Sequence, residues 1–568
     1  MAYSLGELSR EYSQRATAAG LSIDCLMDGD VNSTVAIIGE WPERRACEMK
    51  LPFTGGAGKL VWDTLNKFGL RRQNVYMTYM VKKRLIETYG TGKTEGISKN
   101  ELSYWKAMLT WELSCLPNLR YVLILGNLPL EALTGHTGID KWRGSVLACS
   151  DLRDDLHVVV AHNPSLMVVK PSLEPIFKLD CQKLHMVMQG QWTPHHITPI
   201  YDTSPTEAKS WCDKMIQEDA AVSFDIEVVS GETACVGLAN DAHTGMCINF
   251  RGRMHNRWTP REESQVRQSI QRVLRHAKVQ LVAQNGGFDC GWLWYKDRIK
   301  VRPLWMDTLL AHHTMHPTWP HNLGFLTAQY TTHPFYKDDK DEWREGGDIS
   351  SFWEYNVKDC CITWEVARRL HKELQSQKLW SFFTDHVMRL QPHLVSATVL
   401  GNCVDLIMRE KLNNEYTRDV EALEKEFNEA ARIATGDAEL TVNPNSPKQL
   451  GELLFQRLRL TGKNASTNKE NRLSMIENPR TSDAARHMLQ ILDTYSKQHK
   501  LLSTYISAAI DSDGRMRSDY KQYGVQNTPG RLSSSSTLWG SGMNLQNQPE
   551  RLRGMFIADK IMIPESDW

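Results

Sequence analysis

The sequence predicts a multidomain α/β protein with a mainly helical C-terminal part, and three observations predict it. Residues 35–38 are an apolar run ending at a turn, and a glycine-rich loop follows, as where a strand leads into a helix. Residues 220–227 are an apolar run that ends in two carboxylates, which indicates a second buried strand. Beyond about residues 375–385, the apolar residues take the spacing of long helices.

Length and composition are those of a globular protein. A chain of 568 residues is long enough for about three to five domains. Its 67 basic and 67 acidic residues cancel, so a nucleic-acid surface has to come from local clusters of charge. The N-terminus lacks a basic flank before an apolar core, and no apolar run approaches the roughly 18 residues of a membrane span. We expect a cytoplasmic protein, in a bacterial host cytoplasm if it is viral, with no membrane partner.

The 12 cysteines indicate a reducing compartment. They are scattered without a C-x-x-C pair, and the adjacent pair Cys360 and Cys361 cannot form a tetrahedral zinc site without distant ligands. We expect buried, reduced thiols.

The first element is the strand at residues 35–38, which is followed by the glycine-rich loop at 51–59. A phosphate-binding P-loop is excluded there, because Phe53 stands where its first glycine is required and Leu60 where Ser or Thr binds magnesium.

Four segments resemble the uracil-DNA glycosylase superfamily, especially its family 4 type: residues 39–42, 52–58, 121–126 and 162–165. The resemblance implies an α/β/α domain, to which we assign residues 1–190. It also implies that a base flipped out of the DNA stack rests on Phe53, with Glu40 or His162 near the sugar.

Two departures from that family bear on activity. Glu43 replaces a glycine and adds a negative charge beside an approaching phosphate. Residues 79–83 read Tyr-Met-Val-Lys-Lys where the family has Asn-Val-Val-Lys-Cys, so a base-reading amide and an iron–sulfur cysteine are missing. We therefore expect no iron–sulfur cluster. Three roles stay open for this domain: uracil excision, DNA binding or template sensing, and a purely structural role.

Residues 191–205 are rich in Pro, His and Thr, which favours an extended linker. After the linker, Asp225 and Glu227 lie at positions i and i+2 of a strand and share one face. Asn285 and Asp289 lie at i and i+4, one helical turn apart. Tyr355 and Asp359 repeat this spacing at the start of an amphipathic helix.

These three pairs resemble the motifs of the DEDDy 3′-5′ exonucleases. The resemblance implies a ribonuclease-H-like exonuclease domain, at residues 206–378, with two Mg²⁺ or Mn²⁺ ions. Asp225 would bridge both ions, Glu227 and Asp359 would hold the ion on the nucleophile side, and Asp289 would act mainly through the outer shell. Tyr355 would orient the attacking water, Asn285 would contact DNA, and Asp307 would support the fold.

In the C-terminal part, Ser446 and Pro447 predict the start of a helix, since they are a capping residue and a proline at the first helical position. Later polar residues have the chemistry to contact phosphates, sugars and the minor groove without reading sequence. They are Lys500, Ser503, Thr504, Arg531, Ser533, Asn544, Gln546, Asn547 and Arg553.

Residues 500–505, 530–534 and 544–549 resemble segments of the family A DNA polymerases. The resemblance implies that residues 379–568 are a helical thumb and the start of the polymerase palm. Asp567 and Trp568 match the first two positions of the family's Asp-aromatic-Ser-Gln strand, so Asp567 would be a catalytic metal ligand. We expect polymerisation, and dNTP binding, to require a second polypeptide with the rest of the palm and the fingers; a piece of a longer or interrupted chain stays the alternative.

The leading hypothesis is the N-terminal part or a subunit of a DNA-dependent DNA polymerase of family A, phage-type, with a proofreading 3′-5′ exonuclease. Its substrates would be primer-template DNA and single-stranded 3′ ends. Two alternatives are a stand-alone 3′-5′ DNA exonuclease and a non-catalytic DNA-binding subunit of a polymerase.

Overall fold

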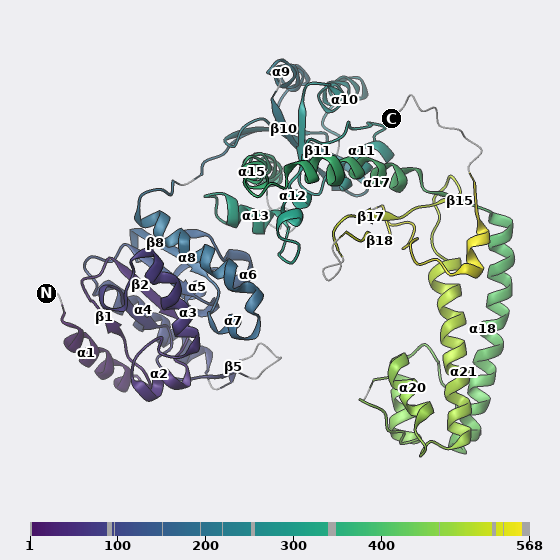
Figure 1. Cartoon of the computed structure of the whole chain (residues 1–568), viewed down its shortest axis with the longest axis horizontal. Coiled ribbons are helices and arrows are strands. Elements are labelled where there is room, and N and C mark those ends of the chain that lie inside the picture. The colour runs from purple at the N-terminus through teal and green to yellow at the C-terminus, as the bar shows by residue number, and fades with distance from the viewer. Residues whose placement is uncertain are drawn as a thin grey trace. The chain divides into compact units, whose positions relative to one another are not determined.

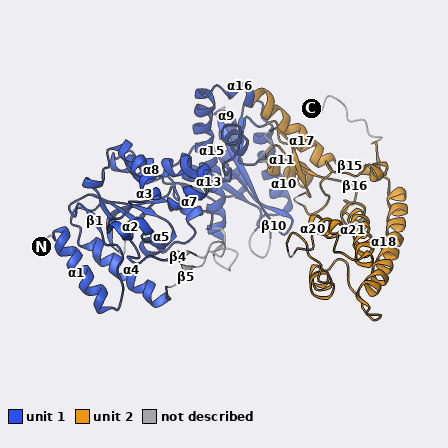
Figure 2. Cartoon of the chain, turned by 60° about the horizontal axis from the view of Figure 1, so that its bottom comes forward, with its two compact units in different colours: residues 1–286, 304–383 blue, residues 287–303, 384–568 orange. Residues whose placement is uncertain are grey.

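The computed structural model describes residues 3–87, 94–95, 97–149, 152–193, 195–218, 220–251, 256–338, 348–464, 466–524, 530–537 and 539–558. The chain divides into two compact units (Figure 2). The first contains residues 1–286 and 304–383, and the second contains residues 287–303 and 384–568. Across the described ranges, no helix is long and apolar enough to cross a membrane.

The N-terminal part of the first unit is a six-stranded sheet with the strand order β1-β3-β2-β6-β8-β7 (Figure 1). Its four central strands are parallel, and the two edge strands are antiparallel to their neighbours. The strands are β1 (Asp28–Gly29), β2 (Val35–Gly39), β3 (Tyr76–Tyr79), β6 (Tyr121–Leu125), β7 (Val146–Cys149) and β8 (Arg153–Ala161).

Helices cover both faces of this sheet, which explains why β2 is apolar at every position. Ala36 and Ile38 face a core formed with α1 (Leu5–Ala18), α4 (Lys99–Ser114) and α5 (Asn127–Thr134). Val35 and Ile37 face a second core, formed with α3 (Gly56–Leu65) and α8 (Glu174–Met188). The predicted α/β/α arrangement is confirmed.

A buried ion pair lies within the first of these cores. Lys82 and Glu112 are both 0% exposed, and Lys82 Nζ lies 2.7 Å from Glu112 Oε2. Lys82 also donates to Thr78 Oγ1 and to the carbonyl of Tyr79, while Tyr76 donates its hydroxyl to Glu112 Oε1. Both charges are thus satisfied inside the protein, as buried charges have to be.

The segment expected to be an extended linker, residues 191–205, contains a short strand. β9 (Thr198–Ile200) pairs in parallel with β12 (Thr244–Asn249) at the edge of the next sheet. Pro199 lies in this edge strand, where a missing N–H is tolerated. Pro205 then begins α9 (Pro205–Gln217), behind a capping box formed by Ser204 and Glu207.

The second sheet of this unit has the order β14-β13-β10-β11-β12-β9. β10 (Ala221–Val229), β11 (Glu232–Ala239) and β12 are antiparallel, while β13 (Gln280–Ala283) is parallel to β10 and β14 (Met306–Asp307) to β13. Two helices, α9 and α10 (Pro260–Arg275), pack against each other, and the 28-residue α15 (Ile349–Ser376) packs on β10, β11 and β12. The sheet with flanking helices matches the predicted exonuclease architecture.

The second unit contains two long helices, α18 (Leu406–Thr435) and α21 (Asp483–Lys500), which lie side by side (Figure 1). They share a core with α19 (Pro447–Gly451) and α20 (Lys469–Glu477). Ser446 caps α19 by accepting the N–H of Gln449, and Pro447 is its first residue, so the predicted helix start is confirmed. In the same unit, α11 (Gly287–Tyr295) packs on α17 (Arg389–Leu400).

Short strands lie between α17 and α18 and after α21. β15 (Asn402–Val404) pairs with β16 (Arg515–Met516) and with β19 (Phe556–Ile557), and β17 (Asp519–Lys521) pairs with β18 (Ser533–Ser535). The helices and short strands fit the thumb and the start of a palm that the sequence predicts.

Candidate functional site

Three carboxylates meet on the second sheet of the first unit. Asp225 and Glu227 lie on β10 with one residue between them, so both side chains leave the same face of the sheet. Asp359 reaches this face from α15. One oxygen from each of the three residues lies within 4.8 Å of the others. Oxygen ligands at this spacing fit a hard divalent cation such as Mg²⁺ or Mn²⁺.

Neighbouring side chains hold these carboxylates in place. Asn356 donates its side-chain amide to Asp225 Oδ2 at 2.9 Å. The hydroxyl of Tyr336 donates to Asp359 Oδ1 at 2.5 Å. Lys337 Nζ lies 2.6 Å from both oxygens of Asp359 and donates to the hydroxyl oxygen of Tyr355 at 2.9 Å.

Tyr355 lies beside the carboxylates as a proton donor. Burial and the charge of Asp359 raise the pKa of its hydroxyl above the ordinary value. The hydroxyl therefore keeps its proton at neutral pH and can donate a hydrogen bond, but it cannot act as a base.

The second predicted motif has a different local structure from the one expected. Asn285 has a φ of 59°, in the left-handed region, and α11 begins only at Gly287. The predicted helical turn from Asn285 to Asp289 is therefore wrong at its first residue. The cause is Asp307, whose carboxylate accepts the N–H groups of Asn285 at 3.1 Å and Gly286 at 2.8 Å.

Asp307 also caps α12 (Thr308–Met315) by accepting the N–H groups of Leu309 and Leu310. Its predicted role in supporting the fold is thus confirmed. Asp289 lies on α11, which belongs to the second unit.

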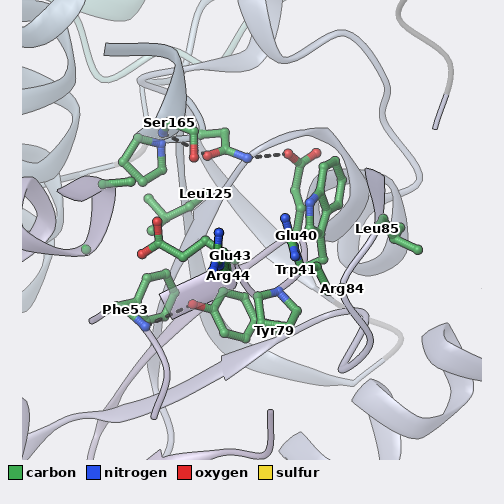
Figure 3. A pocket seen from close by; sticks show the side chains of 16 residues that line it. Glu40, Trp41, Glu43, Arg44, Phe53, Tyr79, Arg84, Leu85, Leu125 and Ser165 are labelled. Carbon is green, nitrogen blue, oxygen red and sulfur yellow. Dashed lines mark hydrogen bonds between the residues drawn. The ribbon is translucent and has the colours of Figure 1, made fainter. Parts of the chain in front are cut away.

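A pocket in the N-terminal part of the first unit is lined by two of the three residues predicted for a glycosylase-like site, Glu40 and Phe53 (Figure 3). The Glu40 carboxylate accepts the N–H groups of Asn127 at 2.8 Å and Leu128 at 3.1 Å, at the start of α5, and the amide of Asn163 at 2.6 Å. A negative charge is favourable at a helix N-terminus.

The ring of Tyr79 packs against Phe53 in this pocket. The two ring centroids are 4.9 Å apart, and the hydroxyl of Tyr79 accepts the N–H of Phe53 at 2.9 Å (Figure 3). Phe53 itself has a φ of 53°. The Glu43 carboxylate also lines the pocket and accepts the N–H of Gly55 at 2.7 Å. His162 is buried 2.9 Å from Asp140 and does not line this pocket.

The DNA-contact residues predicted for the C-terminal part lie on exposed ends and loops of the second unit. Lys500 ends α21, and Ser503 and Thr504 follow in the helical turn η6 (Leu501–Ile506). Arg531, Gln546, Asn547 and Arg553 are exposed, whereas Ser533 and Asn544 are half-buried. Asn544 joins strand β18 to the loop around residue 545, because its side-chain oxygen accepts the hydroxyl of Ser534 and the N–H of Gln546.

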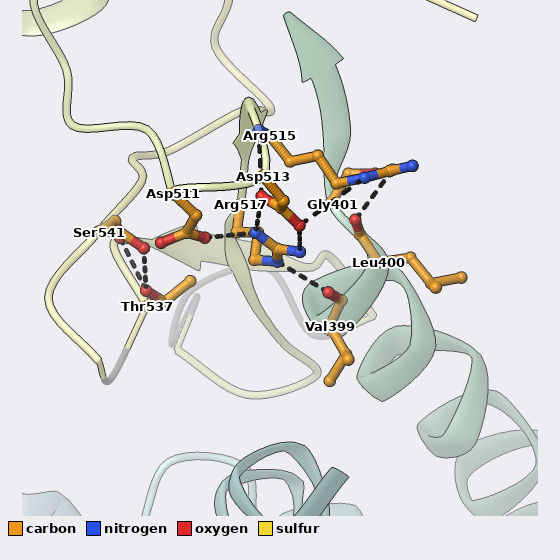
Figure 4. Close-up of polar contacts among 9 residues, drawn as sticks. All are labelled: Val399, Leu400, Gly401, Asp511, Asp513, Arg515, Arg517, Thr537 and Ser541. Atoms are coloured by element: carbon orange, nitrogen blue, oxygen red, sulfur yellow. Dashed lines mark hydrogen bonds and ion pairs between the residues drawn. The ribbon is translucent and has the colours of Figure 1, made fainter. Parts of the chain in front are cut away.

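The backbone carbonyl of a buried arginine, Arg517, accepts the N–H of Met543, next to Asn544. Arg517 is 4% exposed, and its guanidinium donates to the carbonyl of Val399 and to the carboxylates of Asp511 and Asp513 (Figure 4). Its partners come from α17 and from the turn that precedes β16, so one side chain joins separate elements of the unit. Asp567 and Trp568 lie outside the described residues.

Four residues of these sites escaped the sequence analysis. Tyr336, Lys337 and Asn356 contact the carboxylates without belonging to a recognised motif; the position of Asn356 next to Tyr355 is the signal that points to it. Tyr79 was visible as a departure from a family pattern, but its packing on Phe53 was not.

Three family models match successive parts of the chain. The uracil DNA glycosylase superfamily matches residues 26–185, the 3′-5′ exonuclease family residues 200–375, and DNA polymerase family A residues 407–568. The three matches follow the order of the parts described above.

Among relatives, the DNA polymerase of Escherichia phage T5 is 24% identical over 476 residues, which are 76% of this chain and 52% of that protein. The DNA polymerase of Bacillus phage SP01 is 22% identical over 607 residues, with 89% of this chain and 62% of that protein covered. DNA polymerase I of Synechocystis sp. is 27% identical over 307 residues, 52% of this chain and 30% of that protein. This chain spans less than two thirds of the length of each. It combines a uracil-DNA glycosylase-like domain, a 3′-5′ exonuclease domain and a segment of DNA polymerase family A, the domains of a nucleic-acid-processing enzyme.

Proposed function

We propose that this chain is part of a DNA-dependent DNA polymerase of family A, and that its central domain removes nucleotides from the 3′ ends of DNA as a proofreading exonuclease. The observation that supports the exonuclease most directly is the cluster of Asp225, Glu227 and Asp359, whose oxygens lie within 4.8 Å of one another. Three carboxylates at this distance repel one another unless cations lie between them.

These carboxylates would hold two divalent cations, Mg²⁺ or Mn²⁺, which would supply activation of the attacking water and stabilisation of the departing 3′ oxygen. A part for Asp289 as a further metal ligand stays a prediction from the sequence. Neighbouring side chains of this chain orient the carboxylates and the substrate. Asn356 fixes Asp225, and Tyr336 fixes Asp359. Tyr355 keeps its proton, and with cations on Asp359 its hydroxyl would donate a hydrogen bond that orients the water or a phosphate oxygen.

For the polymerase part, we propose that the exposed polar residues of the second unit hold primer-template DNA without reading its sequence. Lys500, Arg531 and Arg553 would contact phosphates, and Gln546 and Asn547 would contact the minor groove. The catalytic role of Asp567, the binding of dNTP and the need for a second polypeptide stay predictions from the sequence. So does a location in the cytoplasm.

The test is incubation of the purified chain with a 5′-labelled, mismatched primer on a template, with Mg²⁺ and all four dNTPs. We expect a ladder of shortened primers that disappears when the metal is chelated. Asp225→Ala should lower the rate at least about 100-fold, whereas Glu232→Ala, at the exposed start of β11, should retain it.

The other outcomes separate the alternatives. A normal rate in Asp225→Ala would show that the site is assigned wrongly. DNA binding without any hydrolysis would favour a non-catalytic DNA-binding subunit. Shortening that no added polypeptide converts into extension would favour a stand-alone exonuclease.

A further inference from the structure

A short segment of the first unit, residues 335–338, contacts both the glycosylase-like domain and the exonuclease carboxylates. It follows α13 (Leu323–Tyr330) and contains the consecutive residues Phe335, Tyr336, Lys337 and Asp338. The first and last of these contact the glycosylase-like domain. The two between them contact α15.

The contacts with the glycosylase-like domain involve α6 (Ile139–Trp142) and the residues after it. The ring of Phe335 meets Trp142 edge to face, with centroids 5.3 Å apart, and the N–H of Phe335 donates to Ser145 Oγ at 3.2 Å. Lys141 Nζ lies 3.1 Å from both carboxylate oxygens of Asp338. Aromatic pairs of this geometry stabilise beyond the area they bury, whereas the half-exposed ion pair contributes little.

The contacts with the exonuclease site come from Tyr336 and Lys337. Tyr336 is 4% exposed and bonds to Asp359, which fixes the backbone beside its neighbour. The ammonium group of Lys337 bridges Asp359 and Tyr355, at 2.6 Å and 2.9 Å. Its side chain is only 21% exposed, so these bonds lie in a partly water-excluded place, where charge-assisted bonds are strong.

The bridge has a chemical consequence for Tyr355. Because Lys337 donates to the hydroxyl oxygen, the proton of Tyr355 has to point away from Lys337. The same ammonium fixes the orientation of the Asp359 carboxylate, which needs a defined geometry to hold a cation. One side chain thus sets the direction of two groups on which the proposed reaction depends.

We propose that Lys337 is a positioning residue of the exonuclease, and that the glycosylase-like domain holds Lys337 in place through Phe335 and Trp142. The proposal rests on the proposed exonuclease function. It gives the glycosylase-like domain a role that does not depend on excising a base.

The first experiment measures steady-state hydrolysis of a 5′-labelled single strand by the full chain, with kcat and KM determined separately and Mg²⁺ varied. Lys337→Met should lower kcat by about 100-fold with KM for DNA little changed, and Lys337→Arg should restore part of the loss. Lys372→Met changes an exposed lysine on α15, the helix that carries Tyr355 and Asp359; it is the matched control and should behave as the unaltered chain.

The second experiment follows the contact with the glycosylase-like domain. Trp142→Ala should lower kcat about five-fold, within the range known for residues that act through a packed network. Trp142→Phe should retain the rate, because an aromatic ring stays against Phe335. Combining Trp142→Ala with Lys337→Met should give the loss of Lys337→Met alone, since both changes remove the same positioning.

Hydrogen exchange tests the same contact without added metal and without catalysis. In metal-free protein, Trp142→Ala should accelerate hydrogen exchange in residues 331–338 while leaving β10 unchanged. A thermal melting curve shows whether the variant is folded.

The outcomes distinguish the inference from the function on which it rests. If the unaltered chain does not hydrolyse DNA, or Asp225→Ala hydrolyses it normally, the proposed exonuclease fails. If Asp225→Ala is inactive but Lys337→Met is as active as the control, only the positioning role fails. Higher activity of Lys337→Met at low Mg²⁺ would also overturn it, because Lys337 would then compete with the cation. If the losses of kcat in the two single variants multiplied in the double variant, the link between Trp142 and Lys337 would be overturned.

Discussion

Replacing Arg517 by methionine should make local opening of β16 and β17, the strands on either side of residue 517, more favourable. Arginine and methionine side chains both fill space along the strand, but methionine donates no hydrogen bond. The change therefore removes the bonds to Val399, Asp511 and Asp513 that Figure 4 shows.

The size of the effect follows from how deeply each partner is buried. The side chain of Asp511 is 9% exposed, and leaving such a carboxylate without its cation costs roughly 3–5 kcal/mol. The side chain of Asp513 is 46% exposed, so water replaces the arginine there and the loss is about 0–1 kcal/mol. The carbonyl of Val399 adds roughly 1 kcal/mol. Together these losses lower the free energy of local opening by about 4–7 kcal/mol, which is a factor of roughly 10³ to 10⁵ in the opening equilibrium.

Hydrogen exchange measured by mass spectrometry reports this opening directly, since the second unit need not unfold as a whole. Peptides that cover β16 and β17 should exchange faster in Arg517→Met, while peptides from α18 should not change. Asp511→Ala should accelerate exchange more than Asp513→Ala, because only the first carboxylate is buried. Equal effects of the two alanine variants, or unchanged exchange in Arg517→Met, would refute the reasoning from burial.

Three further predictions concern the first unit. Burial lowers the pKa of His312 to about 2 and that of His321 to about 4, below the unfolded value of roughly 6.5. Because both imidazoles are neutral in the folded protein, the melting temperature should fall as the pH falls from about 6.5 toward 4. His321→Asn should make the melting temperature less dependent on pH in this range. Glu112→Ala should lower the free energy of unfolding by roughly 3–5 kcal/mol in denaturant melts, because it strands the buried ammonium of Lys82; a loss below 1 kcal/mol would contradict this. Uracil-containing duplex DNA should yield no abasic sites, since Tyr79 stands where the related glycosylases have a base-reading amide and packs against Phe53 in the pocket; release of free uracil would refute that prediction.

Local features of the fold could be predicted from the sequence because they depend on neighbours along the chain. The apolar runs of β2 and β10 are strands, and Ser446 caps a helix, as expected. The pairing of Asp225 with Glu227 follows from the two-residue repeat of a strand. The tertiary position of Asp359 beside them was predictable only from the resemblance to a known family.

The features that the sequence could not predict depend on side chains that are distant along the chain. The left-handed turn at Asn285 is fixed by the carboxylate of Asp307, 22 residues later. Lys337 reaches Asp359 across 22 residues as well, and nothing near it in the sequence marks it as part of a site. In both cases the deciding interaction is a tertiary contact with no periodic signature.

The contact between Phe335 and Trp142 has a consequence for how this protein can change during evolution. If the exonuclease domain depends on this contact, selection acts on the contact surface of the N-terminal domain and leaves the pocket of that domain freer to vary. Selection would then act on Trp142 and Phe335 together, whether or not the pocket around Glu43 and Tyr79 binds a base. The N-terminal domain would then be kept for the support that it gives to Lys337, independently of any chemistry in its own pocket.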